Sequence, residues 1–190
     1  MRLFLVFLMA SAVWAQDYET LLRQARKGDP ATDFTALRAA YTRRPGYNGY
    51  ETPPQLAPML KALASSDWAE AEKQAAPLAI SNYLQLDAHY VLLLISKRRG
   101  DATGEKQHDF MLRGLSSAIR AGHDGSSPEQ AWKALSVAEE FSVCRLAGWR
   151  LKSQDRVHQG AREFDRVMVT NADGKTFPIY FDITDWFGKL

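Results

Sequence analysis

Helical periodicity over most of the chain, and its replacement by strand-like alternation near residue 160, constrain the fold more than any other sequence feature. Between residues 17 and 149, apolar side chains recur three or four positions apart, and glycine, proline or a capping residue ends each run. We expect short helices at about residues 17–27, 33–41, 53–63, 67–78, 88–99, 110–121 and 127–149. Such helices with brief connections favour antiparallel hairpins.

One pair of these helices, residues 67–101, has about the length of a tetratricopeptide repeat. When the pattern is aligned on Trp68, Glu72 and Leu84 occupy the positions where small residues let paired helices approach. We therefore expect helical hairpins that are tetratricopeptide-like at most. Residues 88–96 are apolar on nearly all sides, which is typical of a helix at the centre of a core.

The last predicted helix has the clearest start in the chain. Ser127 is a capping residue, Pro128 suits the first helical position because its missing N–H has no partner there, and Gln130 can bond back to the cap. No proline or glycine follows before Gly148. We therefore expect one helix from Ser127 to about Trp149.

Near residue 160 the pattern changes to that of a β-hairpin. Phe164–Thr170 and Thr176–Thr184 are rich in strand-favouring residues, and the Asn-Ala-Asp-Gly between them is typical of a hairpin turn. An isolated hairpin is only marginally stable in water, so its apolar face must pack on the helices. Pro178 places the second strand at an edge, or at a point where no N–H is required. That apolar face comprises Phe177, Ile179, Phe181 and Ile183.

The expected architecture is mostly α within the α+β class: about seven short helices in antiparallel hairpins, with a C-terminal β-hairpin at about residues 162–184 packed on them. No linker is long enough to separate two domains, so we expect one domain over residues 16–190. Cys144 is the only cysteine, so no internal disulfide can form. Its apolar neighbours indicate a buried, unreactive thiol.

The N-terminus has the pattern of a signal peptide. Position 2 is basic, residues 3–13 are almost entirely apolar, and Val13-Trp14-Ala15 places small residues three and one positions before a cleavage site. The apolar run is too short to cross a membrane, which needs about 20 residues. The alternative, a buried N-terminal helix, fits less well because core helices carry polar residues on one face. We expect residues 1–15 to be removed after Ala15, leaving a periplasmic or secreted protein.

The charge balance argues against a dedicated nucleic-acid or anionic-membrane binder. The chain has 24 Lys and Arg against 22 Asp and Glu, a net charge of +2. Proteins that bind nucleic acid concentrate basic residues on one face. The only basic clusters in the sequence are Arg43-Arg44 and residues 97–99, and the second suits a helix end, where cations complement the helix dipole.

The loop at residues 122–127 holds a base, a carboxylate and hydroxyl groups beside a predicted helix start. One interpretation makes His123 a general base beside Asp124, or Ser126 a nucleophile. Adjacent residues in a turn rarely point at a common atom, however, and no nucleophile-elbow sequence surrounds Ser126. The turn chemistry favours the other interpretation, a connection between helices in which Asp124 bonds local backbone.

The sequence indicates no metal or cofactor site. Glu139 and Glu140 are neighbours, so a helix turns them about 100° apart and they cannot both face one ion. One of them can still pair with a carboxylate or base from another element. No phosphate-binding loop or dinucleotide fingerprint occurs. No two histidines have the spacing that places two ligands on one helical face: His89, His108, His123 and His158.

Several blocks of the chain stand in a characteristic order. They are residues 33–42, Tyr47-Asn48, residues 124–131, residues 139–141, Gln154, Phe164-Asp165 and residues 179–183. In this order and spacing they resemble a family of exported bacterial proteins known as domain of unknown function 4919. His123 departs from the family pattern and looks like an insertion, which weakens a catalytic role for it. The resemblance implies an envelope or secreted protein with a helical body and a C-terminal strand pair, and it implies no reaction.

The leading functional hypothesis is a non-enzymatic binding or accessory module of the bacterial cell envelope, with an unknown protein or small-molecule partner. Stacked helical hairpins without a catalytic motif favour it. Tyr47 and Tyr50, in an aromatic loop, are the candidate binding residues because tyrosines at surfaces commonly anchor partners.

The alternative hypothesis is a hydrolase-type enzyme that uses polar residues near the 122–127 loop and the helix at 139–140. A structural role as caps and buried hydrogen-bond partners explains the same residues. Their convergence in one cleft would favour the enzyme, and their dispersal over separate faces would oppose it. The candidates are Asp124, Glu139, Glu140, Gln154 and Asp165.

Overall fold

Three aspartates begin helices in the same way in the computed structural model, which describes residues 17–188. At Asp33, Asp67 and Asp101 a side-chain oxygen accepts the backbone N–H three residues on, at 2.9, 3.1 and 3.0 Å. These caps begin α2 (Phe34–Tyr41), α4 (Trp68–Ser81) and α6 (Ala102–Arg120). The predicted starts of α2 and α4 are confirmed. The α6 helix begins earlier than predicted. The prediction missed its first two turns because they are polar and carry no apolar stripe.

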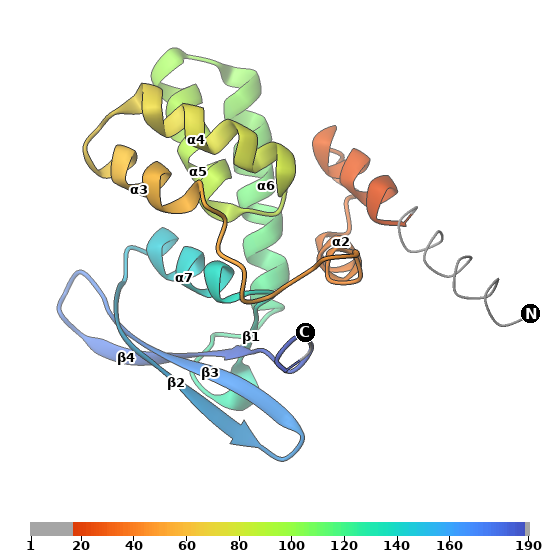
Figure 1. The fold of residues 1–190 in the computed structure, drawn as a ribbon, viewed down its shortest axis with the longest axis vertical. Coiled ribbons are helices and arrows are strands. Elements are labelled where there is room, and N and C mark those ends of the chain that lie inside the picture. Colours follow the sequence, from red (N-terminus) through yellow and green to blue (C-terminus); the bar gives the residue numbers. More distant parts are fainter. Residues whose placement is uncertain (1–16, 189–190) are drawn as a thin grey trace, which may run out of the picture.

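The central helices pack as consecutive neighbours. The α3 helix (Leu56–Ala64) packs on α4, α4 on α5 (Leu86–Arg99), and α5 on α6, while a first helix covers residues 17–26 beside α2 (Figure 1). Ala88 and Val91 of α5 are fully buried, which confirms the predicted core helix. Gly100 ends α5 with a φ of 67°, a left-handed conformation that glycine adopts without strain.

The predicted helix from Ser127 to about Trp149 is wrong in its first half. Residues 128–130 form a single 3₁₀ turn, strand β1 (Trp132–Lys133) follows, and helix α7 covers only Val137–Leu146. The Ser127 hydroxyl donates to the Glu129 carboxylate instead of capping a helix. Ser136 is the cap, and its side chain accepts the N–H of Glu139 at 3.1 Å. The local helix-start pattern at Ser127 does not decide the structure here, because Trp132 is buried as part of the sheet.

A four-stranded mixed sheet forms the other layer, in the order β1-β4-β3-β2. Its long strands are β2 (Arg150–Gln159), β3 (Arg162–Thr170) and β4 (Thr176–Asp182). The three run antiparallel in sequence, and β1 joins the edge of β4 in parallel. The predicted hairpin of β3 and β4 is confirmed, and its inner face carries buried Val167, Ile179 and Phe181.

Strand β2 forms one edge of the sheet, and on the other side β4 is only partly covered by the short strand β1. Strand β2 was not predicted, because nearly all its side chains are exposed and leave no apolar alternation. On β4, the N–H of Tyr180 points away from β3 and donates to the Gly125 carbonyl at 2.8 Å. Pro178, two residues earlier, faces the same side, where β1 does not extend. The missing N–H of Pro178 is therefore not required, as predicted.

Helix α7 lies between the sheet and the other helices (Figure 1). A buried carboxylate ties it to α5: Asp87 accepts hydrogen bonds from Arg145 Nε at 3.1 Å and from Arg145 Nη2 at 2.6 Å, and another from the Ser142 hydroxyl. This forked ion pair fixes α7 against the helices above it. The position of α7 decides where its two adjacent glutamates point.

The connection between α2 and α3 runs past the start of α7 and then rises to α3, and the C-terminal segment lies near it (Figure 1). Gly49 in this connection packs so closely on the Trp186 ring that a Cβ there would overlap the ring. The Gly49 carbonyl also accepts the N–H of Val137, the first residue of α7, at 3.0 Å. Within residues 17–188, no helix combines the length and the apolar character needed to cross a membrane.

Candidate functional site

Three of the five polar candidates from the sequence come together. The Gln154 amide of β2 donates to Glu140 Oε2 at 3.0 Å and to Asp165 Oδ2 at 2.8 Å. Glu140, on α7, is fully buried, and Asp165, on β3, is nearly so. Glu140 Oε1 has no hydrogen-bond partner among the described residues. The three side chains form a bridge between helix and sheet.

Electrostatics keep a proton on this bridge. Burial raises the pKa of Glu140 well above its usual range, and the nearby carboxylates of Asp165 and Glu139 raise it further. Burial also raises the pKa of Asp165, although hydrogen bonding from Gln154 opposes that shift. Both shifts favour the protonated carboxyl form, and the stronger shift is that of Glu140, so Glu140 holds a proton more readily than Asp165 does. None of the three residues lines either of the two cavities described below.

Glu139 points the other way, as the helical geometry requires. Its Oε2 accepts hydrogen bonds from Arg38 Nη2 at 2.8 Å and from the N–H of Leu135 at 2.6 Å. Arg38 is almost completely buried and also donates to the Lys133 carbonyl at 2.6 Å. Glu139 thus holds a buried arginine of α2 in place.

Asp124 lies apart from the other four candidates. It is exposed, and its Oδ1 accepts the N–H of Ser126 at 2.9 Å. Hydrogen bonding from Ser126 lowers the pKa of Asp124. The carbonyl of His123 accepts the Trp132 indole N–H at 2.9 Å. These contacts are those of a turn packed on β1, so the five candidates do not share one cleft.

A basic cleft of about 570 Å³ opens between α2, β1, residues 43–47 and the C-terminal segment. Four basic side chains and one acidic side chain line it, together with Thr35, Tyr47, Trp186 and small apolar residues. The charged residues are Arg38, Arg43, Arg44, Lys133 and Asp185. Cleft lining with this imbalance produces a positive potential that attracts anions.

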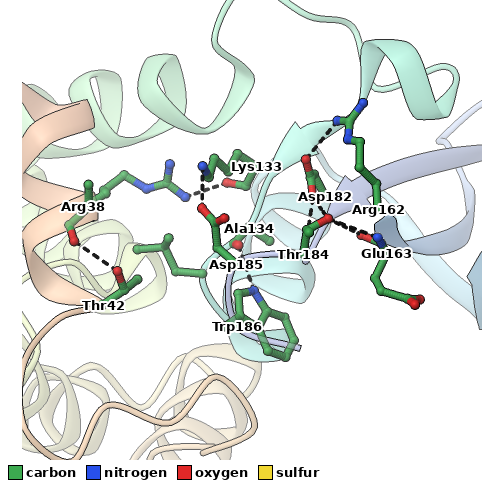
Figure 2. Close-up of polar contacts among 12 residues, drawn as sticks. Arg38, Thr42, Lys133, Ala134, Arg162, Glu163, Asp182, Thr184, Asp185 and Trp186 are labelled. Carbon is green, nitrogen blue, oxygen red and sulfur yellow. Dashed lines mark hydrogen bonds and ion pairs between the residues drawn. The ribbon is translucent and has the colours of Figure 1, made fainter. Parts of the chain in front are cut away.

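On the α2 side of the basic cleft, a hydrogen bond and an ion pair connect the charged side chains. Figure 2 shows the Arg38 guanidinium directed at the Lys133 carbonyl, and the Lys133 ammonium directed at the Asp185 carboxylate. The Lys133–Asp185 ion pair measures 2.6 Å, and both side chains are more than half exposed. Arg38 Nε has no hydrogen-bond partner within residues 17–188. Part of the hydrogen-bonding capacity of this buried cation is therefore unused.

The C-terminal segment that carries Asp185 is anchored on both sides of it. The Trp186 indole N–H donates to the Ala134 carbonyl at 2.9 Å. On the other side, the Asp182 carboxylate accepts hydrogen bonds from the Thr184 hydroxyl at 2.6 Å and from Arg162 at 2.8 Å (Figure 2). Asp185 is consequently held at the mouth of the cleft.

Tyr47, one of the two candidate binding aromatics, lines the basic cleft. Its hydroxyl donates to the Leu135 carbonyl, and burial, reinforced by Glu139, raises its pKa so that it stays protonated. Tyr50 does not line the cleft: its ring packs edge-on against Trp186, and its hydroxyl accepts the N–H of Gly188 at 3.3 Å. The aromatic loop thus contributes one wall residue and one residue that covers Trp186.

Arg43-Arg44, one of the two basic clusters in the sequence, is the part of this cleft that has a local sequence pattern. Arg44 stacks over the rings of Tyr18 and Tyr41, with its guanidinium carbon 4.7 Å and 5.4 Å from the ring centres. Arg38, Lys133 and Asp185 went unrecognised, because only the fold brings their distant segments together.

Cys144 is the single cysteine of the chain, and its side chain is buried, as predicted. Burial raises the pKa of the Cys144 thiol to about 12, which favours the protonated and less reactive form. Within residues 17–188, no three His, Cys, Asp or Glu side chains are grouped so that they could hold a metal ion. The basic cleft, by contrast, has side chains that can bind a negatively charged group.

The sequence of this fold matches one family model over residues 13–188, described as Domain of unknown function (DUF4919). The chain belongs to this family. The match covers both the helices and the sheet, so the family domain includes the basic cleft and the Glu140 bridge. No curated protein and no solved structure matches the chain.

Proposed function

We propose that this DUF4919 protein is a non-enzymatic binding module of the bacterial cell envelope whose basic cleft holds an anionic ligand. The observation that carries the proposal is the excess of basic side chains at the cleft: four line it against one acidic side chain, and Glu139, which pairs with Arg38 from behind, adds a second carboxylate. The whole chain has a net charge of only +2, so this local excess is a concentration of charge and not a reflection of overall composition.

The chemistry of the cleft suits carboxylate or phosphate groups. Guanidinium and ammonium groups form charge-assisted hydrogen bonds with both. Arg38 is held from behind by Glu139 and the Lys133 carbonyl, so it loses little conformational freedom when a ligand binds. A volume of about 570 Å³ lies within the usual range for small-molecule sites.

A titration with succinate, a small dianion, tests this proposal. We expect backbone amide NMR signals of α2, β1 and residues 184–187 to shift on addition of succinate. Lys133→Gln should weaken binding about fivefold, since a unit charge near 4 Å contributes about 1 kcal/mol in water. Lys175→Gln, in the exposed β3–β4 turn, is the matched control and should leave the affinity unchanged. Succinate that shifts no signals of the cleft would contradict the proposal.

Export is part of the same proposal. Residues 1–16 lie outside the described residues, so the support for a signal peptide is the sequence pattern alone. The mature protein should begin at Gln16 and be released to the periplasm or the medium. Intact-mass measurement of the protein from a bacterial host checks this, and soluble protein that retains residues 1–15 would refute it.

Hydrolysis remains a second candidate function because of one observation. Glu140 and Asp165 are two adjacent carboxyl groups with raised pKa values, and such perturbed groups are enriched at catalytic sites. Against it, Asp124 and Glu139 lie elsewhere. If Glu140 is catalytic, Glu140→Gln should abolish hydrolysis; if Glu140 only joins the helix to the sheet, the substitution should change stability alone.

A further inference from the structure

A second cavity, of about 350 Å³, adjoins the basic cleft on the other side of Tyr47. Gly46, Tyr47 and Leu135 line both cavities, and the hydrogen bond from the Tyr47 hydroxyl to the Leu135 carbonyl forms the ridge between them. A ligand that extends beyond the basic cleft over this ridge enters the second cavity.

The second cavity has a different chemical character. Its polar lining is made mainly of amides and hydroxyls: Asn48, Gln55, Ser81, Asn82, Gln85 and Ser136. Pro53 and Pro54 stiffen its loop wall. All of its lining residues except Glu51 are uncharged, and we therefore call it the neutral cavity.

Two amide groups of the neutral cavity have unused donors. Asn48 Oδ1 accepts the N–H of Tyr50 at 2.9 Å, and Asn82 Oδ1 accepts the N–H of Leu84 at 3.2 Å. These bonds fix the oxygen of each amide toward its own turn, and neither Nδ2 group has a hydrogen-bond partner within residues 17–188. Both cavity-lining residues can therefore donate to carbonyl oxygens of a ligand.

Gln85 adds a third amide in a fixed position. It is buried, and its nitrogen lies 3.4 Å from both Asp87 Oδ2 and the Ser142 hydroxyl. These contacts hold the Gln85 side chain from behind, in the same network that ties α7 to α5. A peptide backbone, which repeats a carbonyl acceptor and an N–H donor at each residue, matches such a set of amides.

The charged side chains that line the two cavities also differ in sign. The basic cleft has an excess of cations, whereas Glu51 of the neutral cavity forms no ion pair within residues 17–188. A ligand with carboxylates at one end and an ammonium group at the other complements this arrangement. A short acidic peptide with free termini has both features.

We infer that the ligand is a short acidic peptide whose carboxylates occupy the basic cleft and whose amino-terminal part lies in the neutral cavity, near Glu51. This inference rests on the proposed anion-binding function and adds the class of ligand to it. Tyr47 is the residue that the peptide crosses, and its ring offers an apolar surface between the two polar ends.

The probes for a test are the free tetrapeptide Ala-Ala-Glu-Glu, its N-acetylated form, and succinate, each titrated under the same conditions. We expect the free tetrapeptide to bind at least tenfold more tightly than succinate. Glu51→Gln should weaken the free tetrapeptide about fivefold and leave the acetylated form and succinate unchanged. Glu19→Gln, on the exposed side of the first helix, is the control and should change none of the three.

The possible results separate this inference from the proposed function. Succinate that binds as tightly as the tetrapeptide would overturn the peptide inference and leave the anion-binding function standing. Failure of both to bind would contradict the function and the inference together. A tetramer of galacturonic acid that binds more tightly than the peptide would mean that the extended ligand is an acidic oligosaccharide, and would overturn the inference.

Discussion

Arg38 of α2 and Glu139 of α7, 101 positions apart in the sequence, form a buried ion pair with 2.8 Å between Nη2 and Oε2. The same carboxylate oxygen accepts the N–H of Leu135. The pair therefore joins the helix that lines the basic cleft to the helix that lies on the sheet.

Removal of the carboxylate should be costly. Glu139→Ala leaves the Arg38 guanidinium buried without a counter-charge, and the expected loss is about 3–5 kcal/mol in the free energy of unfolding. Urea unfolding followed by circular dichroism measures it. Asp109→Ala removes an exposed pair with Arg113 on one helix and is the control that should barely move the midpoint. Equal midpoints for the two variants would show that the buried pair stabilises nothing.

Glu140 should make stability depend on pH in a defined direction. Its pKa in the folded protein lies above the ordinary 4.5, so its contribution to stability is complete below pH 4.5 and is lost as the pH rises through the folded value. Glu140→Gln stays neutral at every pH. Relative to wild type, this variant should become more stable as the pH is raised from 4.5 to 7.5.

The same variant tests whether the Glu140 proton is linked to folding. A glutamine can donate to Asp165 and accept from Gln154, so a purely structural bridge survives the substitution. Urea unfolding at the two pH values measures the difference. A stability gap that is the same at both would mean that the Glu140 proton is not linked to folding.

His89 should act in the opposite direction. Its Nε2 lies 2.8 Å from the Tyr83 carbonyl and must donate to it, so its Nδ1 accepts a hydrogen bond from His108 Nδ1–H, with 3.0 Å between the two nitrogens. Burial lowers the pKa of His89 from 6.5 to about 4. Stability from the neutral ring is therefore complete above pH 6.5 and is lost as the pH falls toward 4, by about 3 kcal/mol. His89→Gln should flatten this part of the pH profile; an unchanged slope would contradict the assignment.

The two serines before α7 provide a matched pair. Ser136→Ala removes the side chain that caps α7 and should lower the free energy of unfolding by about 1 kcal/mol. Ser127→Ala removes only a hydrogen bond to the exposed Glu129 side chain and should be nearly neutral. Chemical unfolding of both variants decides the matter. A larger loss of unfolding free energy for Ser127→Ala than for Ser136→Ala would mean that Ser127, and not Ser136, caps the helix.

The parts of the fold that were predictable depend on local signals. Asp33 and Asp67 cap helices through atoms three residues away, and alternation in β4 separates buried Phe181 from its half-buried neighbours. Strand β1 was not predictable, because two residues become a strand only through pairing with Phe181 and Asp182 across the sheet. Tertiary pairing overrides the helix start at Ser127 for the same reason.

The site was predictable only in part, because contacts between segments that are distant in the sequence form much of it. The resemblance pointed to Glu140, Gln154 and Asp165, and the fold joins them by hydrogen bonds. Arg38 and Lys133 carry no local pattern, because their relation is a contact between α2 and β1. The charge concentration in the basic cleft is a property of the folded surface and has no counterpart in the balanced composition.

The most direct test of the basic cleft uses Ala39, an exposed α2 residue that lines it. Ala39→Glu adds a carboxylate among the cations, and Ala39→Gln adds a side chain of nearly the same size without charge. Repulsion and partial neutralisation should weaken succinate binding at least tenfold in Ala39→Glu relative to Ala39→Gln, a difference of about 1.4 kcal/mol. An NMR titration of both variants measures it. Equal dissociation constants would contradict anion binding in the cleft.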